Sequence, residues 1–270
     1  MNDEYLVSII MGVFNIENLS VFRDSMLSIL DQNYKNFEFI ICNDGSIDKT
    51  DEILNEWAEK DSRIKIITSK ENRGLAFALN RCIDESKGEY IARHDADDIS
   101  NKDRIKKQVD FLNRNKDIDF VGCNVLLYNE QEIWGKRYLK ELPQKEDFLF
   151  VMPFVHGTLI FRKESLIRCG KYKVSRQTMR AEDYDMLMRM YSMKMRGSNI
   201  QETLYLYMED VNSIKRRKYK DRFYEMIVRL IGFYKMGILI KGLPYAVKPL
   251  LVGLIPINVM KKIKTLQYKT

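Results

Sequence analysis

Short apolar segments alternate with helical patterns through the first hundred residues, and this alternation constrains the fold more than any other feature. Four segments have nearly continuous apolar cores and are predicted strands: Leu6–Val13, Phe37–Cys42, Ile64–Thr68 and Glu89–His94. The segments between them have helical periodicity: Leu19–Gln32, Asp48–Lys60 and Arg73–Lys87. Strands that alternate with helices form parallel sheets with helices on both faces. We therefore predict an α/β fold with a mostly parallel central sheet flanked by helices.

The pattern continues less regularly after residue 100. A helix is predicted from Lys102 to Asn115, a strand over Phe120–Tyr128 and another strand over Val155–Arg162. A methionine-rich helix over Glu182–Met195 and a strand over Asn199–Tyr207 complete this part. Methionine commonly fills irregular gaps in hydrophobic cores, so the methionines of this helix are interpreted as core residues.

Polar side chains follow three of the first four predicted strands. Asn15 follows the first strand, Asp44 the second, and Asp95 and Asp97 the fourth. The carboxyl ends of parallel strands meet at one edge of a sheet, where ligands of such folds bind. We therefore expect these side chains to converge on one crevice.

Three carboxylates crowd the four positions from Asp95 to Asp98, directly after a predicted strand. Adjacent anions repel one another, and a hard divalent cation such as Mg²⁺, which takes oxygen ligands, relieves that repulsion. The Asp-x-Asp spacing also occurs at 117–119 and 183–185, so the spacing alone is a weak signal. Because only the 95–98 cluster follows an apolar β-type segment and precedes a loop, it is the predicted metal–diphosphate site.

Composition describes a globular protein whose thiols are reduced. The chain has 270 residues, of which 45% are hydrophobic and 31% charged. The four cysteines are far apart in sequence, and only two histidines accompany them, which argues against a zinc site. The chain opens with a predicted strand rather than a secretion leader, so we expect free thiols in a cytoplasmic protein.

The C-terminal segment differs from the rest in charge. A basic amphipathic helix is predicted over Arg216–Met236, and an apolar stretch interrupted by lysines and prolines runs from Gly237 to Met260. This composition favours a helical extension that lies on an anionic membrane surface. The alternative is a helical hairpin packed on the catalytic domain. No nucleic-acid-binding motif accompanies the charge, so no nucleic-acid partner is expected. The predicted division is a catalytic domain over 1–212, with halves 1–100 and 101–212, and an extension over 213–270.

Four motifs in order resemble one enzyme family. They are Val7-Ser8-Ile9-Ile10-Met11-Gly12-Val13-Phe14-Asn15, Asn43-Asp44-Gly45-Ser46-x-Asp48-x-Thr50, Asn72-Arg73-Gly74 and Arg93-His94-Asp95-Ala96-Asp97-Asp98. Together they resemble glycosyltransferase family 2, whose members are inverting enzymes of GT-A fold that use nucleotide-sugar donors. The resemblance covers about residues 5–210 and is greatest to bacterial enzymes of O-antigen and capsular polysaccharide synthesis.

The resemblance implies a set of donor-binding residues at the sheet edge. They are Val13, Asn15, Glu17, Asp44, Asn72, Arg73, Arg93, Asp95, Ala96 and Asp97. The aspartate at 44 corresponds to the position that contacts uracil in the family. Two of these motifs also have purely structural interpretations. Asp44-Gly45-Ser46 would also serve as a tight turn that caps the next helix, and Asn72-Arg73-Gly74 would also cap the helix it begins.

The resemblance also implies a metal site and a catalytic base. Asp97 coordinates the cation, Mn²⁺ or Mg²⁺, and Asp95 contacts the cation or the ribose, whereas Asp98 braces the loop. An inverting transfer needs a base, for which Asp183 is the first choice and Glu182 the reserve. Acids in the first turn of a helix are also favoured by the helix dipole alone. The predicted acceptor-binding residues are His156, Gly157 and Arg180.

The expected function is metal-dependent transfer of one sugar from a UDP-sugar to a saccharide acceptor linked to undecaprenyl diphosphate. The expected place is the cytoplasmic face of the inner membrane, with the enzyme held peripherally. No Gln-x-x-Arg-Trp motif is present, which favours transfer of a single sugar over polymerisation. Three alternatives remain open: a polyprenyl-phosphate glycosyltransferase, a nucleotidyltransferase, and a catalytically silent nucleotide-binding scaffold.

Overall fold

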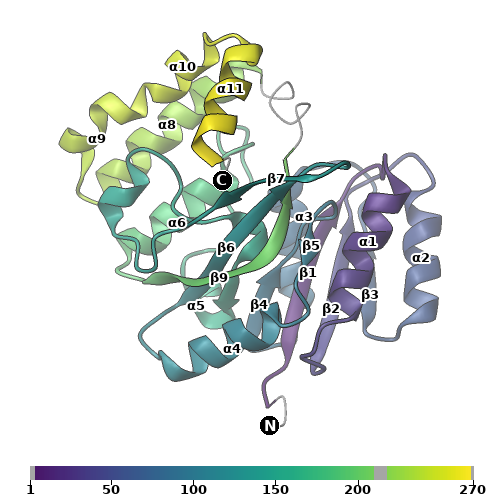
Figure 1. Cartoon of the computed structure of the whole chain (residues 1–270). Helices are drawn as coiled ribbons and strands as arrows, with labels where there is room; N and C mark the ends of the chain where they lie inside the picture. Colours follow the sequence, from purple (N-terminus) through teal and green to yellow (C-terminus); the bar gives the residue numbers. More distant parts are fainter. Residues whose placement is uncertain (1–3, 210–217, 269–270) are drawn as a thin grey trace.

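The computed structural model describes residues 4–209 and 218–268, which form a curved sheet covered by helices on both faces (Figure 1). The sheet order is β3-β2-β1-β4-β8-β6-β9-β5, and β7 pairs with β6 outside this path. The strands are β1 Val7–Val13, β2 Phe37–Asn43, β3 Ile64–Thr68, β4 Tyr90–Arg93, β5 Ile99–Ser100, β6 Phe120–Tyr128, β7 Ile133–Arg137, β8 Ile160–Arg162 and β9 Gly197–Met208.

Strands β1 to β4 pair in parallel, as predicted, and β6 also pairs with β9 in parallel. Strand β8 lies between β4 and β6 and is antiparallel to both, and β5 and β7 are antiparallel to their partners. The predicted α/β fold, with a largely parallel sheet and a helical C-terminal extension, is confirmed.

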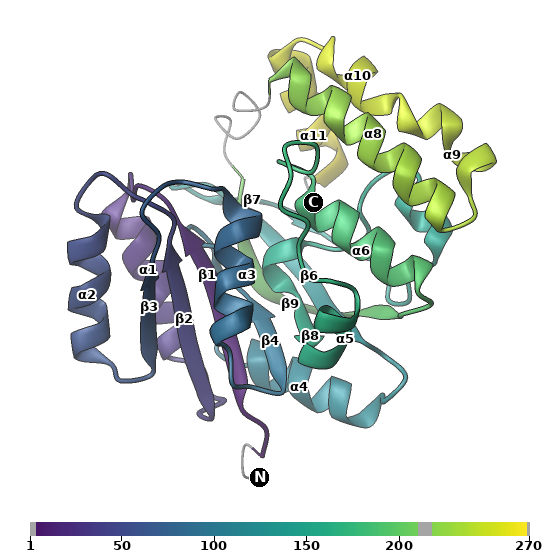
Figure 2. The same ribbon diagram turned by 180° about the vertical axis from the view of Figure 1, so that it is seen from behind.

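Helices α1, α2 and α4 pack on one face of the sheet, and α3, α5 and α6 on the other (Figures 1 and 2). The remaining helices, α8 to α11, form the C-terminal extension. The bounds are α1 Leu19–Leu30, α2 Thr50–Lys60, α3 Leu75–Glu85, α4 Arg104–Arg114, α5 Lys163–Arg168, α6 Glu182–Ser192, α8 Tyr219–Lys235, α9 Leu239–Ala246, α10 Lys248–Gly253 and α11 Ile257–Tyr268; two 3-10 turns are η1 Lys145–Phe148 and η2 His156–Thr158.

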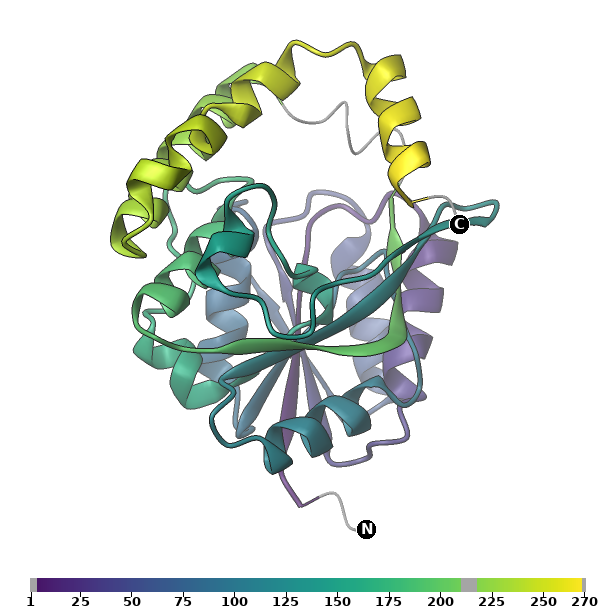
Figure 3. The same ribbon diagram turned by 60° about the vertical axis from the view of Figure 1, so that its left-hand side comes forward.

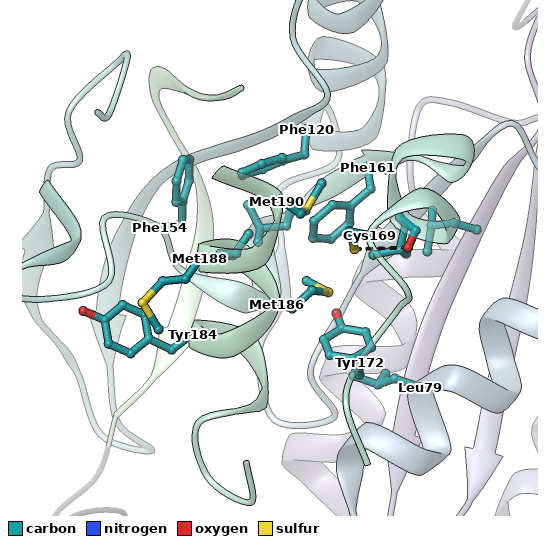
Figure 4. Close-up of a cluster of buried hydrophobic side chains, with 14 of the residues drawn as sticks. Leu79, Phe120, Phe154, Phe161, Cys169, Tyr172, Tyr184, Met186, Met188 and Met190 are labelled. Atoms are coloured by element: carbon teal, nitrogen blue, oxygen red, sulfur yellow. Dashed lines mark hydrogen bonds between the residues drawn. The ribbon is translucent and has the colours of Figure 1, made fainter. Parts of the chain in front are cut away.

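Successive residues of the central strands are buried in two separate cores. On β1, Ile9 and Met11 pack with α1 and α4, whereas Ile10 packs with α3. This alternation follows from the two-residue side-chain period of a strand, and burial on both faces explains why the strands are nearly continuous in apolar residues. On α6, Met186, Met188 and Met190 are fully buried among aromatic rings, which is consistent with core filling (Figure 4).

The predicted strand over Val155–Arg162 is largely wrong. Only Ile160–Arg162 is extended, and the preceding residues form the turn η2, closed by the bond from Thr158 N to Val155 O (3.1 Å). The apolar residues around this turn are buried by tertiary packing, which a sequence pattern cannot distinguish from a strand. Strands β5 and β7 and helix α5 were not predicted from the sequence. The first two residues of the predicted helix over Arg216–Met236 lie outside the described residues.

Helix α8 of the extension packs closely against α6 (Figure 2). A Cβ atom on Gly232 would lie 2.3 Å from the sulfur of Met188, so a larger residue here would have to displace the Met188 side chain. Arg229, which is buried, donates to the carbonyl of Leu149 (3.1 Å) and lies over the ring of Tyr184 on α6. The alternative of a helical segment packed on the catalytic domain therefore holds for α8.

Helices α9 and α10 run on along the top of the molecule, and α11 returns toward β7 (Figure 3). Contact with β7 is close, because a Cβ atom on Gly135 would lie 2.8 Å from the carbonyl oxygen of Tyr268. Within 4–209 and 218–268, no single helix has the length and apolar character needed to cross a bilayer. One bent pair, Leu239–Gly253 with Asn258–Tyr268, meets that test only when its two parts are taken together.

Candidate active site

The ends of β1 and β2 are tied together by the residues predicted to hold the donor. Asn15 has left-handed backbone (φ 48°), which asparagine tolerates better than most residues. Its backbone N–H donates to Ser46 Oγ (2.9 Å), and its side-chain oxygen accepts from Ile47 N (3.1 Å). The carbonyl of Val13 accepts from Asp44 N (2.8 Å). Asn15 therefore shapes the loop that follows β2.

Asp44 is buried and caps a helix, although not the helix suggested by the sequence. Its carboxylate accepts from Gly74 N (2.7 Å) and from Arg73 N (3.1 and 3.2 Å), at the start of α3. The start of α2 is instead bound by Asp48, which accepts from Thr50 N (3.0 Å). The two loops touch at Gly45, where a Cβ atom would lie 2.3 Å from a backbone carbon of Glu71. This packing brings Asp44 and the Asn72-Arg73-Gly74 motif together.

The remaining predicted donor residues of this half are exposed at the same edge. Asn72, Arg73 and Glu17 all lie at the surface, and the guanidinium of Arg73 stacks on the ring of Phe77 at 3.9 Å. Helix α3 begins at Leu75 rather than at Arg73, with Gly74 as its N-cap. Arg73 is therefore held by stacking rather than by an ion pair in the described structure.

The carboxylate cluster lies directly after β4, beside the end of β1. Arg93 is fully buried; its guanidinium forms an ion pair with Asp95 and donates to the carbonyl of His94. The side chain of Asp95 is partly buried, whereas Asp97 is exposed. The backbone carbonyl of Asp97 accepts from the hydroxyl of Tyr128 (2.5 Å), which fixes the loop from β6. Ala96, between the two aspartates, packs against the apolar core.

Asp98 points inward and connects the loop to β9. It is fully buried, and its Oδ1 accepts from Met208 N (2.7 Å). Burial, together with the neighbouring charges of Asp97 and Asp95, raises the pKa of Asp98 well above its ordinary value. This position agrees with the bracing role expected for Asp98 from the sequence.

A closed ring of hydrogen bonds holds the carboxylate loop in place. Three of its members, Ser25, His94 and Tyr205, were given no role in the site from the sequence. Asp95 N donates to the hydroxyl of Tyr205 (3.3 Å), and this hydroxyl lies 3.1 Å from His94 Nδ1. On the other side of the imidazole, His94 Nε2 lies 3.0 Å from Ser25 Oγ. Ser25 Oγ donates to the carbonyl of Asp95 (3.0 Å), which closes the ring. Burial and the nearby Arg104 and Arg93 charges lower the pKa of His94 well below its usual value. His94 is therefore neutral and acts as a structural link.

Two of the predicted acceptor residues lie on the turn η2, and one of them, Gly157, meets the carboxylates. A Cβ atom on Gly157 would lie 2.7 Å from Tyr205 Oη, 2.8 Å from Asp95 Oδ2 and 3.0 Å from Asp98 Oδ2. His156 Nε2 lies 2.7 Å from the hydroxyl of Tyr172. Burial, and secondarily the charge of Arg93, lowers the pKa of His156 well below its usual value, so this imidazole is neutral. The structure therefore brings η2 against the carboxylate loop.

The predicted base lies at the start of α6, across from η2. Burial raises the pKa of the Tyr172 phenol, which also lies within the electric fields of Arg93, Asp183 and Glu182. Burial, followed by the Asp183 charge, raises the pKa of Glu182 to about 7. The carboxylate of Asp183 accepts from Tyr184 N (2.7 Å), and the exposed Arg180 precedes the helix with left-handed backbone (φ 69°). Tyr172, whose hydroxyl lies 2.7 Å from His156 Nε2, is therefore near enough to Arg93 and to the acidic pair for their charges to affect its pKa.

The family model for glycosyl transferase family 2 matches residues 8–178, which include the sheet edge and the carboxylate loop. The chain belongs to glycosyl transferase family 2. It is therefore a glycosyltransferase. Its similarity to a Bacillus subtilis protein named as a glycosyltransferase, EpsE, is 36% identity over 263 residues, covering 97% of this chain and 94% of the relative. It is 32% identical to the Escherichia coli O-antigen biosynthesis glycosyltransferase WbnJ, over 75% of this chain and 79% of the relative.

Similarity to solved structures confirms the predicted GT-A type of the fold for this family 2 glycosyltransferase. A Staphylococcus aureus TarS fragment in complex with UDP-GlcNAc has a TM-score of 0.71 at 17% identity, over 90% of this chain and 72% of the fragment. The mannosyltransferase PcManGT of Pyrobaculum calidifontis, in complex with GDP-Man and Mn²⁺, has a TM-score of 0.63 at 19% identity, over 98% of this chain and 81% of that protein.

The Asp95 and Asp97 carboxylates would fit a divalent cation whose other ligands come from a substrate and water. Within the described residues, no group of three or more His, Cys, Asp or Glu side chains is placed to hold a metal ion. Asp97 is exposed and Asp95 partly so, and both offer hard oxygen atoms. Magnesium-type cations in nucleotide sites take one or two carboxylates and complete their shell with phosphate oxygens and water. The oxygen ligands offered by Asp95 and Asp97 therefore suit a cation that is bound together with a diphosphate.

Gly157→Ala is expected to lower transfer about tenfold or more while the protein stays folded, because the added methyl group displaces the Asp95 carboxylate. The metal concentration that gives half-maximal activity should rise. Gly12→Ala is the matched control, because its Cβ would meet only Leu75 (3.0 Å) and Ala78 (3.1 Å). Titrating Mn²⁺ against both variants is the measurement; an unchanged metal requirement in Gly157→Ala would show that the close approach is unimportant.

Proposed function

We propose that the enzyme transfers one sugar, with inversion, from a UDP-sugar to a hydroxyl of a saccharide linked to a lipid diphosphate, in the synthesis of a bacterial surface polysaccharide. The observation that carries the proposal is the convergence of Asp44, Asp95 and Asp97 on one sheet edge, with the acidic pair of α6 opposite them. Such an edge offers a nucleoside site, a diphosphate–metal site and a base to one substrate.

The donor is proposed to bind along the ends of β1, β2 and β4. Asn15 and Asp44 lie at the strand ends where we place the nucleobase and ribose of the donor, and they offer polar groups there. Arg73 is exposed beside the start of α3. A divalent cation held by Asp97 and Asp95 would stabilise negative charge on the departing nucleoside diphosphate. The TarS fragment is in complex with UDP-GlcNAc, and the E. coli relative WfgD, 37% identical over half of this chain, is named as using UDP-Glc. Both observations support UDP as the nucleotide.

The chemical step needs one proton transfer on the acceptor side. The acceptor hydroxyl loses its proton to the carboxylate of Asp183, with Glu182 as the reserve base. The resulting oxygen bonds to the anomeric carbon as the bond from that carbon to the diphosphate oxygen breaks, which inverts the configuration. The neutral His156, which is partly buried and lies 2.7 Å from the hydroxyl of the buried Tyr172, is proposed to contact the acceptor.

The acceptor class rests on the names of relatives. WfgD is named as acting on GlcNAc-diphosphoundecaprenol, WbnJ as an O-antigen enzyme, and a B. subtilis relative, 34% identical over 45% of this chain, as a teichuronic acid enzyme. A lipid-diphosphate-linked saccharide fits these names. The synthesis of a surface polysaccharide is the shared process.

The test is hydrolysis and transfer measured over a panel of nucleotide sugars with Mn²⁺ and Mg²⁺. We expect slow release of UDP from one UDP-sugar, and faster release when a GlcNAc-diphosphate lipid is added. Preference for a GDP- or dTDP-sugar would contradict the choice of nucleotide. Transfer to polyprenyl phosphate itself would assign the enzyme to the alternative glycosyltransferase class, and no turnover with any donor would favour the scaffold.

A further inference from the structure

The extension exposes large apolar side chains at a higher density than the rest of the described chain, with thirteen in residues 218–268 and thirteen in residues 4–209. On α9 and α10, Ile240, Leu243, Val247, Leu251 and Leu254 are all exposed, the first to 87% and the last to 70%. On α11, Val259, Ile263 and Leu266 are exposed, the last to 83%. Exposed apolar side chains that gather in one part of a protein mark an interaction surface more often than single scattered ones do.

The exposed residues of each helix recur at helical spacing. The positions 240, 243, 247, 251 and 254 differ by three or four, and so do 259, 263 and 266. The first set therefore follows one side of the segment formed by α9 and α10, including the residue that joins them and the residue after α10, and the second set lines one side of α11. The opposite side of α9 is buried at Gly242 and Ala246, which pack against the rest of the extension. We call the eight exposed residues the apolar face.

The charge of the extension favours an anionic membrane, rather than a second copy of this chain, as the partner of the apolar face. Residues 215–270 contain fourteen lysines and arginines and two acidic residues, a formal charge of +12, whereas residues 1–214 carry −5. Lys241 and Lys262 are exposed next to apolar-face residues in the sequence. A second copy of this chain would present the same positive charge and be repelled, whereas an anionic bilayer attracts each such lysine by about 1 kcal/mol.

We propose that the apolar face lies in the headgroup region of an anionic phospholipid membrane and holds the active site next to that surface. The extension is joined to both sides of the site. Helix α8 packs on α6, which carries the candidate base, and α11 forms an ion pair from Lys264 to Glu209, next to the Met208 that binds Asp98. A bilayer bound by α9 to α11 is therefore rigidly related to the carboxylate loop.

This placement deepens the proposed function, on which it rests only for the identity of the acceptor. A lipid-linked acceptor presents its saccharide at the headgroup level, so an enzyme held there meets a high local concentration of acceptor. The peripheral placement at the cytoplasmic membrane face is part of the same proposal. Vesicle binding itself needs neither donor nor acceptor.

The test uses the full chain and vesicles of phosphatidylcholine with or without phosphatidylglycerol. We expect co-sedimentation with the anionic vesicles and its weakening by added salt. The double variant Leu251→Glu, Leu254→Glu should lose vesicle affinity about tenfold or more, because it removes two exposed leucines from the apolar face and adds two negative charges that an anionic membrane repels. Ile167→Glu is the matched control, because Ile167 is also an exposed aliphatic residue (52%) but lies on α5.

Donor hydrolysis keeps the two proposals distinguishable, because both variants should hydrolyse the donor at the rate of the parent protein. Transfer to a vesicle-borne acceptor should fall in the double variant, while transfer to a short water-soluble analogue should not. Equal vesicle binding by the double variant and the control would overturn the proposal. A parent protein that is dimeric in solution, with a monomeric double variant, would overturn it in favour of a second copy on the apolar face.

Discussion

Asp97→Ala is expected to lower sugar transfer by about a thousandfold or more and to leave the fold intact. The side chain is exposed, so its removal opens no cavity in the core, whereas it takes a carboxylate from the position proposed to bind the cation. An excess of EDTA should stop the parent enzyme to a similar extent, and added Mn²⁺ should restore it. The measurements are initial rates of UDP release and the thermal unfolding midpoint of the variant.

Asp117→Ala is the control for this prediction, because it removes an aspartate from another Asp-x-Asp pair. Asp117 is exposed and forms an ion pair with Arg196 far from the carboxylate loop in sequence. Surface ion pairs contribute about 0–1 kcal/mol, so both rate and stability should change little. Undiminished turnover in excess EDTA would remove the metal from the proposed reaction, even if Asp97→Ala were inactive.

The parallel half of the fold could be predicted because its signals are local. Each strand from β1 to β4 is a short apolar segment between helical patterns, and parallel pairing places the strand ends at one edge. The meeting of Asn15, Asp44 and the Asp95–Asp98 loop followed from that topology alone. The family resemblance added the roles of individual residues, which no periodicity contains.

The contacts that complete the site could not be predicted because they join distant segments. Gly157 approaches Asp95 through a turn that has the composition of a strand, and Tyr205 reaches the loop from more than a hundred residues away. Asp44 caps α3 rather than α2, because the loop after β2 packs on the loop before α3. In each case tertiary packing selected one of several conformations that the local sequence permits.

Replacing the two acids of α6 one at a time is expected to identify the base. If Asp183 is the base, Asp183→Asn should lose transfer by about a thousandfold while it still binds UDP. Glu182→Gln should then remain active, and the titration near pH 7 should disappear from its profile of kcat/KM. The measurements are pH profiles of kcat/KM and UDP binding by calorimetry for both variants.

The opposite result has an equally definite signature. With Glu182 as the base, Glu182→Gln is the inactive variant, and the parent activity falls as pH drops below about 7, where this carboxylate takes up a proton. The Asp183 charge helps to raise the pKa of Glu182, so Asp183→Asn would move that acid limb to lower pH. A shift of the limb in Asp183→Asn would therefore transfer the role of base to Glu182.

The same titration should be visible in stability, independently of activity. The pKa of Glu182 is about 7 in the folded protein and 4.5 as its ordinary value, so folding favours the protonated form. Its favourable contribution is complete below pH 4.5 and is lost as the pH rises through 7. Glu182→Gln, which cannot ionise, should therefore gain up to about 3 kcal/mol relative to the parent between pH 4 and pH 8. Denaturant unfolding at these two pH values measures the difference, and an equal effect of the substitution at both would show that Glu182 does not titrate in a buried position.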